Sequence, residues 1–428
     1  MTVTSIHLDT NVDKTKKIPF TAYDFGWVVL CIGMAIGSGI VFMPVQIGLK
    51  GLWVFLAAVG LSYPAVYYLQ ELFLRTLIQS EKCDSYANII SHYLGKNWGI
   101  ALGVVYFLML LTGVLTYSTA ITYDSSSYLQ TFKLTEQSYS DYAWYGLIVV
   151  SLLVFISAQG ERFLFKIAGP MVIVKFSIIV TLAVIMVPYW SLANLQQLPN
   201  FFTFFRDVLL TLPFALFSIL YVQILSPMNI AYRKLEKDPL VAAYRSVRAN
   251  RLAYRTIVIA VLFFAISFSF SITKEEAVQA LEQNISALAI AAKVIPGAWV
   301  QGMSVLLNVF AIMSAFFGIY MGFHEAVKGI VDNLLSRFIP ESRINAKLVS
   351  LSITIGIVFF LWAWVSTRFS TMLLLQLSGP IFGITACLVP CYLVWKVKSL
   401  QNLRTPAAFY VVFYGVLLVA SPLLKFFE

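Results

Sequence analysis

The sequence predicts an all-α polytopic membrane protein with eleven transmembrane helices. Of its 428 residues, 60% are hydrophobic and only 12% are Asp, Glu, Lys or Arg, whereas soluble domains carry about 25% charged residues. The mean hydropathy of +0.83 is too high for all the apolar side chains to be buried in one aqueous core. Irregular backbone cannot face lipid, and no segment alternates as barrel strands do, so the spans are expected to be helices.

Eleven apolar runs of spanning length follow one another along the chain. They are residues 24–48, 52–77, 98–122, 143–158, 163–187, 208–230, 253–271, 299–325, 348–366, 371–395 and 407–426, here numbered spans 1 to 11. Short polar loops join them, and we expect no soluble domain.

The distribution of Lys and Arg predicts the orientation. Loops on one side of the spans hold 22 of the 30 basic residues, loops on the other side hold seven, and Lys175 lies within span 5. The positive-inside rule then predicts a cytoplasmic N-terminus and, after eleven spans, an external C-terminus. This topology accounts for the formal charge of +10, so no nucleic-acid partner is expected.

Metal and redox chemistry are not expected. The four cysteines, Cys31, Cys83, Cys387 and Cys391, are scattered, and with three His there is no Cys/His cluster of zinc spacing. A membrane-embedded enzyme would need a nucleophile with its base, or a metal set such as His-Glu-x-x-His, within the spans. A sensor would normally carry a soluble output domain. The sequence therefore predicts no cofactor and disfavours both classes.

Span 1 contains residues that weaken a helix in mid-membrane. Gly37, Ser38, Gly39 and Pro44 lie close together in it. Broken backbone at that depth is tolerated only where it lines a cavity, so the break predicts a site for a polar ligand. The alternative is close helix packing, because Gly33 and Gly37 also form a small-residue contact face.

Span 6 is interrupted in the same way, by two prolines and four hydrogen-bonding side chains. These residues are Pro213, Ser218, Tyr221, Gln223, Ser226 and Pro227. Spans 1 and 6 open two halves of five spans each, which is the pattern of an inverted repeat. Such a scaffold holds its ligand at the midplane, where a half-helix N-terminus faces an anionic group and freed carbonyls face a cation. A zwitterionic amino acid satisfies both ends.

Lys175 is the main candidate for a coupling site. It lies roughly 13 Å into span 5 at about 1.5 Å per residue, too deep to snorkel easily. We predict that it binds a proton or takes the place of a coupling ion; the alternative is a static lysine neutralised by a carbonyl or carboxylate. Glu71, His324 and Glu325 are expected to be structural or gating contacts, and Asp124 to be solvated outside the membrane.

Three further features bear on the site. Tyr117 in span 3 and Ser314 in span 8 lie at depths where their hydroxyls reach a central cavity, or else bond to a neighbouring helix. Residues 273–295 begin with a capping box formed by Thr273 and Glu276. They predict one external amphipathic helix, which either covers an entrance or rests at the interface.

Three further segments are distinctive: Gly33-Met-Ala-Ile-Gly-Ser-Gly-Ile-Val-Phe-Met-Pro-Val-Gln-Ile-Gly, Glu282-Gln-Asn-Ile-Ser-Ala-Leu-Ala and Phe317-Gly-Ile-Tyr-Met-Gly-Phe-His-Glu. In these segments the chain resembles the bacterial hydroxy and aromatic amino acid permease family, serine/threonine permease branch. The resemblance implies a leucine-transporter-like fold with a five-plus-five inverted repeat and broken helices 1 and 6. It divides the chain into a cytoplasmic tail (residues 1–22), a transport core (23–396) and an accessory span 11 (397–428).

By the resemblance, the chain imports a small hydroxy or thiol amino acid with protons across the bacterial inner membrane. Many serine and threonine carriers of the family have Asn-His-Ser-Pro in span 6, where this chain has Leu-Tyr-Val-Gln. It looks closest to a subgroup with Ile-Leu-Ser-Pro-Met, which implies L- or D-serine as cargo, with cysteine or threonine close behind. An aromatic amino acid is the alternative cargo, and sodium coupling is left open.

The resemblance also assigns roles to residues of the two broken spans. Span 1 would hold the amine and carboxylate, and span 6 would read the side chain. The predicted substrate-binding residues are Ala35, Ile36, Gly37, Ser38, Gly39, Tyr117, Ser218, Tyr221, Gln223, Ser226 and Ser314. Lys175 is the predicted proton-coupling residue.

Overall fold

The computed structural model describes residues 18–80, 86–159, 161–192, 198–295, 297–335 and 346–427. The regular elements in these ranges are all helical. They are α2 (Ala22–Ala35), α3 (Ser38–Lys50), α4 (Leu52–Gln79), α5 (Tyr86–Leu94), α6 (Lys96–Thr131), η1 (Tyr139–Asp141), α7 (Ala143–Ser157), α8 (Glu161–Ile185), η2 (Val187–Tyr189), α9 (Phe201–Ile219), α10 (Val222–Leu235), α11 (Pro239–Ser271), α12 (Lys274–Glu282), α13 (Ala287–Val294), α14 (Ala298–Leu335), α15 (Ala346–Ser366), α16 (Thr371–Phe382), the π-helical η5 (Gly383–Leu388), α17 (Val389–Lys396), η6 (Lys398–Leu403), α18 (Pro406–Ala420) and η7 (Ser421–Phe427).

The protein is a multi-pass membrane protein. Nine helical stretches in the described part of the chain are long and apolar enough to cross a membrane, and α2 with α3 forms a tenth span bent by 43°. The remaining predicted span, span 4, corresponds to α7 (Ala143–Ser157), an apolar helix of 15 residues that is shorter than the others. The all-helical fold class is thus confirmed, and the count of eleven holds only if α7 is included.

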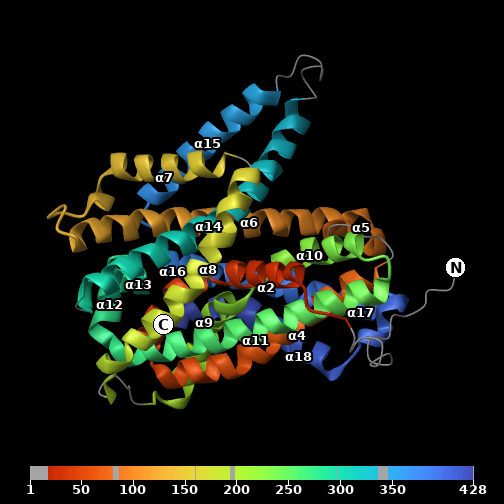
Figure 1. Ribbon diagram of the computed structural model, residues 1–428, viewed down its shortest axis with the longest axis horizontal. Helices are drawn as coiled ribbons and strands as arrows, with labels where there is room; N and C mark the ends of the chain where they lie inside the picture. The colour runs from red at the N-terminus through yellow and green to blue at the C-terminus, as the bar shows by residue number, and fades with distance from the viewer. Residues whose placement is uncertain are drawn as a thin grey trace.

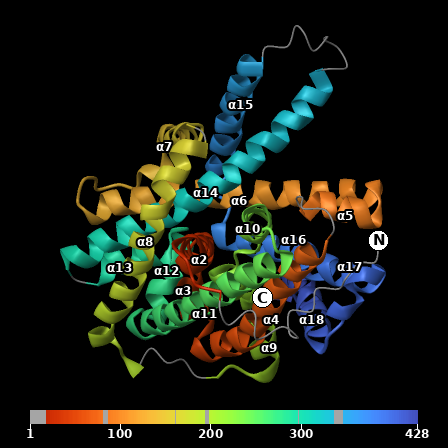
Figure 2. The same ribbon diagram turned by 45° about the vertical axis from the view of Figure 1, so that its right-hand side comes forward.

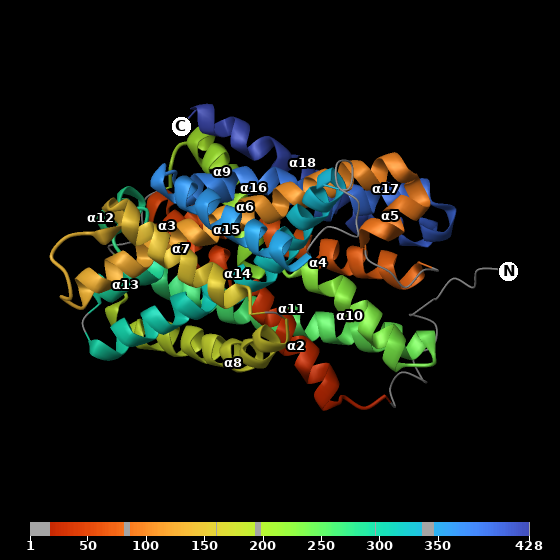
Figure 3. The ribbon, with the colours of Figure 1, turned by 90° about the horizontal axis from the view of Figure 1, so that it is seen from above.

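Helices α4, α6 and α11 run roughly along one axis, α8, α14 and α15 run obliquely to it, and short helices lie at the two ends (Figure 1). Helix α5 lies at one end and the pair α12 and α13 lies at the other. Helices α14 and α15 project together from the rest of the bundle (Figure 2). Seen from above, α17 and α18 lie on the opposite side of the molecule from α2 and α8 (Figure 3).

Two helix breaks lie against each other inside the bundle. Helix α2 ends at Ala35 and α3 begins at Ser38, while α9 ends at Ile219 and α10 begins at Val222. Both breaks are where the sequence predicts them. The second falls between the two prolines rather than at either of them, because each proline is accommodated within a helix.

Gly39 allows the two breaks to touch. A Cβ atom at this position would lie 2.1 Å from the carbonyl carbon of Phe217 and 2.3 Å from the backbone nitrogen of Ser218. Both neighbours are backbone atoms, which cannot rotate away as the end of a side chain can. A glycine is therefore required where α3 crosses the end of α9.

The predicted external helix over residues 273–295 is in fact two helices. The capping box of Thr273 and Glu276 begins α12 as expected. The chain then turns at Asn284, whose φ of 54° is left-handed, and Ser286 caps α13. The single-helix prediction was wrong because Asn tolerates the left-handed turn and Ser supplies a new N-cap.

The basic segment before span 7 is also more ordered than a loop. Helix α11 begins at Pro239, about four turns before the predicted start of the span. Its first turns carry Arg245, which donates to the fully buried carboxylate of Asp24 at 3.0 Å, and Arg251, which pairs with Glu71 at 2.7 Å. These ion pairs join α11 to α2 and α4 and explain why the helix continues.

From the sequence, Asp124 was expected to be solvated outside the membrane, and this prediction was wrong. Helix α6 continues beyond the predicted span to Thr131, so residue 124 lies within the helix rather than after it. The side chain is fully buried. A buried carboxylate needs hydrogen-bond donors, and the donors that Asp124 finds are described below.

Candidate functional site

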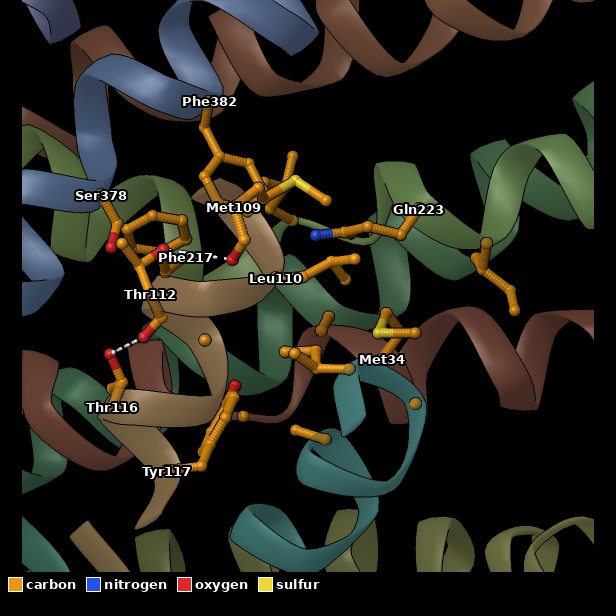
Figure 4. A pocket seen from close by; sticks show the side chains of 18 of the residues that line it. Met34, Met109, Leu110, Thr112, Thr116, Tyr117, Phe217, Gln223, Ser378 and Phe382 are labelled. Atoms are coloured by element: carbon orange, nitrogen blue, oxygen red, sulfur yellow. Dashed lines mark hydrogen bonds between the residues drawn. The ribbon is translucent and has the colours of Figure 1, made fainter. Parts of the chain in front are cut away.

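A cavity of about 250 Å³ lies at the crossing of the two broken helices (Figure 4). Helices α2, α6, α9, α10, α14 and α16 all contribute side chains to its wall. The lining residues are Met34, Ala35, Gly37, Tyr106, Met109, Leu110, Thr112, Gly113, Thr116, Tyr117, Phe217, Leu220, Gln223, Ile224, Pro227, Ala315, Gly318, Ile319, Leu375, Ser378 and Phe382. The wall is therefore mostly apolar, with a small number of polar groups, as is usual for small-molecule sites.

Four of the residues predicted from the sequence line this cavity: Ala35, Gly37, Tyr117 and Gln223. Gly37 keeps space open, because a Cβ there would lie 2.7 Å from the hydroxyl oxygen of Tyr117. The side chain of Gln223 projects into the cavity between Leu110 and Met109 (Figure 4). Its Oε1 is buried and accepts no hydrogen bond from the part of the chain that the structure describes.

Ile36, Gly39 and Ser218 are close to the cavity but do not line it. Gly39 packs on the backbone of α9, as described above. The carbonyl of Ile36 accepts a hydrogen bond from Lys175. The buried hydroxyl of Ser218 contacts the Tyr63 hydroxyl at 3.1 Å and donates to the Ala215 carbonyl at 2.7 Å. The side chain of Ser38 lies outside the described residues.

Tyr221 faces away from the cavity and stabilises the break in span 6. Its backbone N–H donates to Oε1 of Gln70 at 3.0 Å, so Gln70 satisfies a donor that a continuous helix would have used. The Tyr221 hydroxyl donates to the carbonyl and to Oδ1 of Asn250 on α11, at 2.9 Å and 3.0 Å. This contact differs from the prediction that Tyr221 binds the side chain of the substrate.

Lys175 is fully buried on α8, behind the break in span 1. Its ammonium donates to the carbonyls of Gly33 and Ile36 at 2.9 Å and 3.1 Å and to Oγ of Ser314 on α14 at 2.7 Å. These three acceptors match the three donors of an ammonium group. Carbonyls and a hydroxyl are also ligands for a metal cation, so the ammonium occupies the kind of site that such an ion would take.

The position of Lys175 also fits the electrostatics of the broken helix. Gly33 belongs to the last turn of α2, and Ile36 follows that turn directly. The carbonyl end of a helix carries a partial negative charge, which a cation stabilises. Ser314 was predicted from the sequence to bind the substrate, but in the structure its hydroxyl accepts a hydrogen bond from Lys175.

Four polar residues of the cavity wall were not predicted from the sequence: Tyr106, Thr112, Thr116 and Ser378. The Thr116 hydroxyl donates to the Thr112 carbonyl at 2.7 Å within α6 (Figure 4). Thr116 directly precedes Tyr117 and Thr112 lies five residues before it on the same span, so the rule that polar residues of a span face the interior would have found both. The same rule applies to Ser378, which lies within span 10.

A second cavity of about 400 Å³ lies between the first cavity and the α5 end of the bundle. Ser226, another predicted residue, lines this second cavity rather than the first. The two cavities share Tyr106, Met109, Gln223 and Pro227. The second also reaches Ile90 on α5, so it lies between the broken helices and that end.

Comparison with known proteins defines the class. The fold matches the crystal structure of MhsT in complex with L-phenylalanine with a TM-score of 0.52 and 13% sequence identity, over 92% of this chain and 98% of that chain. At this identity the match shows the fold alone. The chain is therefore a polytopic membrane protein with the leucine-transporter-like fold.

The family follows from curated relatives. The chain is 47% identical to the serine transporter of Escherichia coli O157:H7, over 96% of this chain and 94% of that protein. It is 23% identical to the serine transporter SdaC of Escherichia coli K12, over 92% of each chain. No family model matches. The chain belongs to the hydroxy and aromatic amino acid permease family, as the three segments that begin at Gly33, Glu282 and Phe317 indicated, and is thus a transporter homologue rather than an enzyme.

Proposed function

We propose that this protein imports serine across the bacterial inner membrane in symport with protons. The relatives described above are serine transporters, which supports the cargo. The observation that carries the coupling is the Lys175 ammonium, held by two carbonyls of the broken span and by Ser314. A lysine can release its proton and leave these acceptors free, so its protonation state is linked to the geometry of the break.

The proposed orientation puts the N-terminus and α5 in the cytoplasm. It rests on the excess of Lys and Arg in the loops at that end. In this orientation the second cavity lies on the inner side of the first, and α12 and α13 lie on the outer side. Spans 1–5 and 6–10 would form the two inverted repeats, since each half begins with a helix broken at mid-depth.

The half-helix ends give the substrate its polar partners in this proposal. The N-terminus of α3 begins beside Gly37 and offers unpaired N–H groups to the carboxylate. The end of α9, where Phe217 and Leu220 line the cavity, offers carbonyls to the amine. The substrate then bridges the two breaks, and its side chain points along the wall toward Gln223.

Gln223 is the residue proposed to recognise the hydroxyl group of the serine substrate. Its Oε1, which has no hydrogen-bond partner among the described residues, can accept a hydrogen bond from the serine hydroxyl. Alanine has no side-chain donor and cannot make this bond. We expect Gln223→Leu to raise the KM for serine about 10- to 100-fold, the range for losing one buried hydrogen bond. Alanine transport should change much less, which competitive uptake assays can measure.

The matched control for this prediction is Ser226→Ala. Ser226 lies on the same helix but lines only the second cavity, so its loss should leave the serine-to-alanine preference unchanged. Equal discrimination by Gln223→Leu and the unaltered protein would remove Gln223 from the recognition site.

An aromatic amino acid is the second candidate cargo. Met34, Met109, Phe217 and Phe382 give the cavity a large apolar wall, and aromatic rings pack well on such surfaces. Serine is favoured because the relatives are serine transporters and because Gln223 and five hydroxyl-bearing residues belong to the same cavity wall.

The test is uptake of labelled L-serine into proteoliposomes with an inward proton gradient. Unlabelled D-serine, cysteine, threonine, alanine and tryptophan compete in separate reactions. We expect saturable serine uptake that serine analogues inhibit and tryptophan does not. Inhibition by tryptophan with no serine uptake would replace the proposal by the aromatic one.

A further inference from the structure

The buried carboxylate of Asp124 joins three helices at the α12–α13 end of the molecule. Asp124 lies on α6 and accepts from the backbone N–H of Ser286 at 2.7 Å and from Nδ2 of Asn308 at 2.5 Å. Ser286 is the N-cap of α13, and Asn308 lies on α14. All three residues are fully buried. Neither the binding cavity nor the Lys175 site uses this cluster.

The neighbouring groups hold the carboxylate in place. Nδ2 of Asn308 also donates to the hydroxyl of Tyr128 at 2.9 Å, and that hydroxyl donates to the carbonyl of Ser304 at 3.4 Å. A carboxylate at a helix N-terminus gains from the partial positive charge of the first turn. Hydrogen bonds to an ionised group are also stronger than neutral ones. Asp124 is thus a fixed attachment point for the beginning of α13.

The other parts of the α12–α13 pair attach to different helices. A Cβ at Gly48 on α3 would lie 2.5 Å from the Cβ of Ala277, so α12 packs closely on α3. Asn284, in the turn between the two helices, accepts from the N–H of Thr371 at 2.9 Å and donates to the carbonyl of Phe369 at 3.2 Å. The pair therefore spans from the broken span 1 to α6, α14 and α16.

We propose that Asp124 is a latch that holds the α12–α13 pair closed and sets the balance between outer-closed and outer-open states. It is a positioning residue, because it acts on the cavity through α13 and touches no substrate. Opening the outer side requires α13 to leave α6, so the Ser286 N–H and the Asn308 amide must release the carboxylate. The inference rests on the proposed function only for the sidedness and for the transport readout.

The first test compares two substitutions at Ser286. Its φ of −78° suits proline, so Ser286→Pro removes the N–H donor without forcing a new backbone angle. Ser286→Ala removes the same side-chain cap to Ala289 but keeps the N–H. The difference between the two variants therefore measures the hydrogen bond to Asp124. Asp124→Asn, which removes the charge and one acceptor, is the second and independent variant.

The readout is access to the cavity from outside. Thr112→Cys is introduced in a variant whose four native cysteines are replaced, and an impermeant thiol reagent is applied to the outer face of cells. Ser286→Pro and Asp124→Asn should label about tenfold faster or more than the parent, the effect of losing a charge-assisted hydrogen bond. Ser286→Ala should label at nearly the parental rate.

Ser127→Ala is the control on the same helix, because the buried Ser127 hydroxyl has no hydrogen-bond partner among the described residues. In transport assays, Ser286→Pro and Asp124→Asn should lower both KM and kcat for external substrate, since the outer-open state is favoured and closure is slowed. A loss of folding alone would lower the amount of protein without lowering the KM of the protein that remains. Unchanged labelling by folded Asp124→Asn overturns the inference whatever the transported substrate is.

Discussion

Lys175→Ala is expected to abolish proton-driven accumulation of substrate while leaving exchange across the membrane. The substitution removes the only ammonium that bridges Gly33, Ile36 and Ser314 among the described residues, and with it the group whose protonation is linked to the break. Without a coupling free energy between proton and substrate, the concentration ratio should fall to about one. Accumulation under a proton gradient and counterflow of preloaded substrate are measured in the same proteoliposomes.

Ser314→Ala is the matched comparison for this prediction. It removes one of the three acceptors and keeps the ammonium, so accumulation should be reduced but still present. Full accumulation by Lys175→Ala would move the proton site elsewhere in the chain. A loss of counterflow together with accumulation would instead show that Lys175 serves the structure of the break.

Gly37→Leu is expected to lower uptake by about a hundredfold or more while the protein remains in the membrane. A Cβ at this position already meets the Tyr117 hydroxyl at 2.7 Å, and the rest of a leucine would extend into the cavity. Misplacing a bound substrate by about 1 Å can cost about 10²-fold in rate. Initial uptake is measured alongside the amount and thermal stability of the purified variant.

Gly60→Leu controls for adding the same side chain elsewhere. Gly60 is exposed on α4, and a Cβ there meets nothing within 4 Å. We expect this variant to transport normally. Normal uptake by Gly37→Leu would show that the cavity at the crossing of the broken helices is not the transport site.

The sequence predicted those parts of the fold that depend on local chemistry. Glycine, serine and proline within apolar spans located both helix breaks, because these residues weaken a helix wherever they stand. The depth of Lys175 followed from counting residues along span 5. What it bonds to required the fold, since Gly33 and Ile36 are about 140 positions away in the chain.

The remaining differences arise where tertiary partners override the local pattern. Tyr221 is a hydrogen-bonding residue at a break, yet Asn250 on α11 draws its hydroxyl away from the cavity. Asp124 follows an apolar run and was therefore predicted to lie outside the membrane, but it is buried because Ser286 of the α13 N-cap and Asn308 of α14 donate hydrogen bonds to it. Gly37, Tyr117 and Gln223, which the sequence proposed for the site because each is polar or small at mid-depth, line the cavity. Thr112 and Ser378 are also polar residues of spans, but which polar side chains of a span face the cavity depends on the fold.

Serine entry is proposed to carry a proton whose binding depends on Lys175. To test this, a pH-sensitive dye is trapped inside sodium-free proteoliposomes and serine is added outside. We expect acidification of the lumen that depends on serine, follows its uptake and is lost in Lys175→Ala. Entry of labelled serine without acidification, or only when sodium is present, would contradict it.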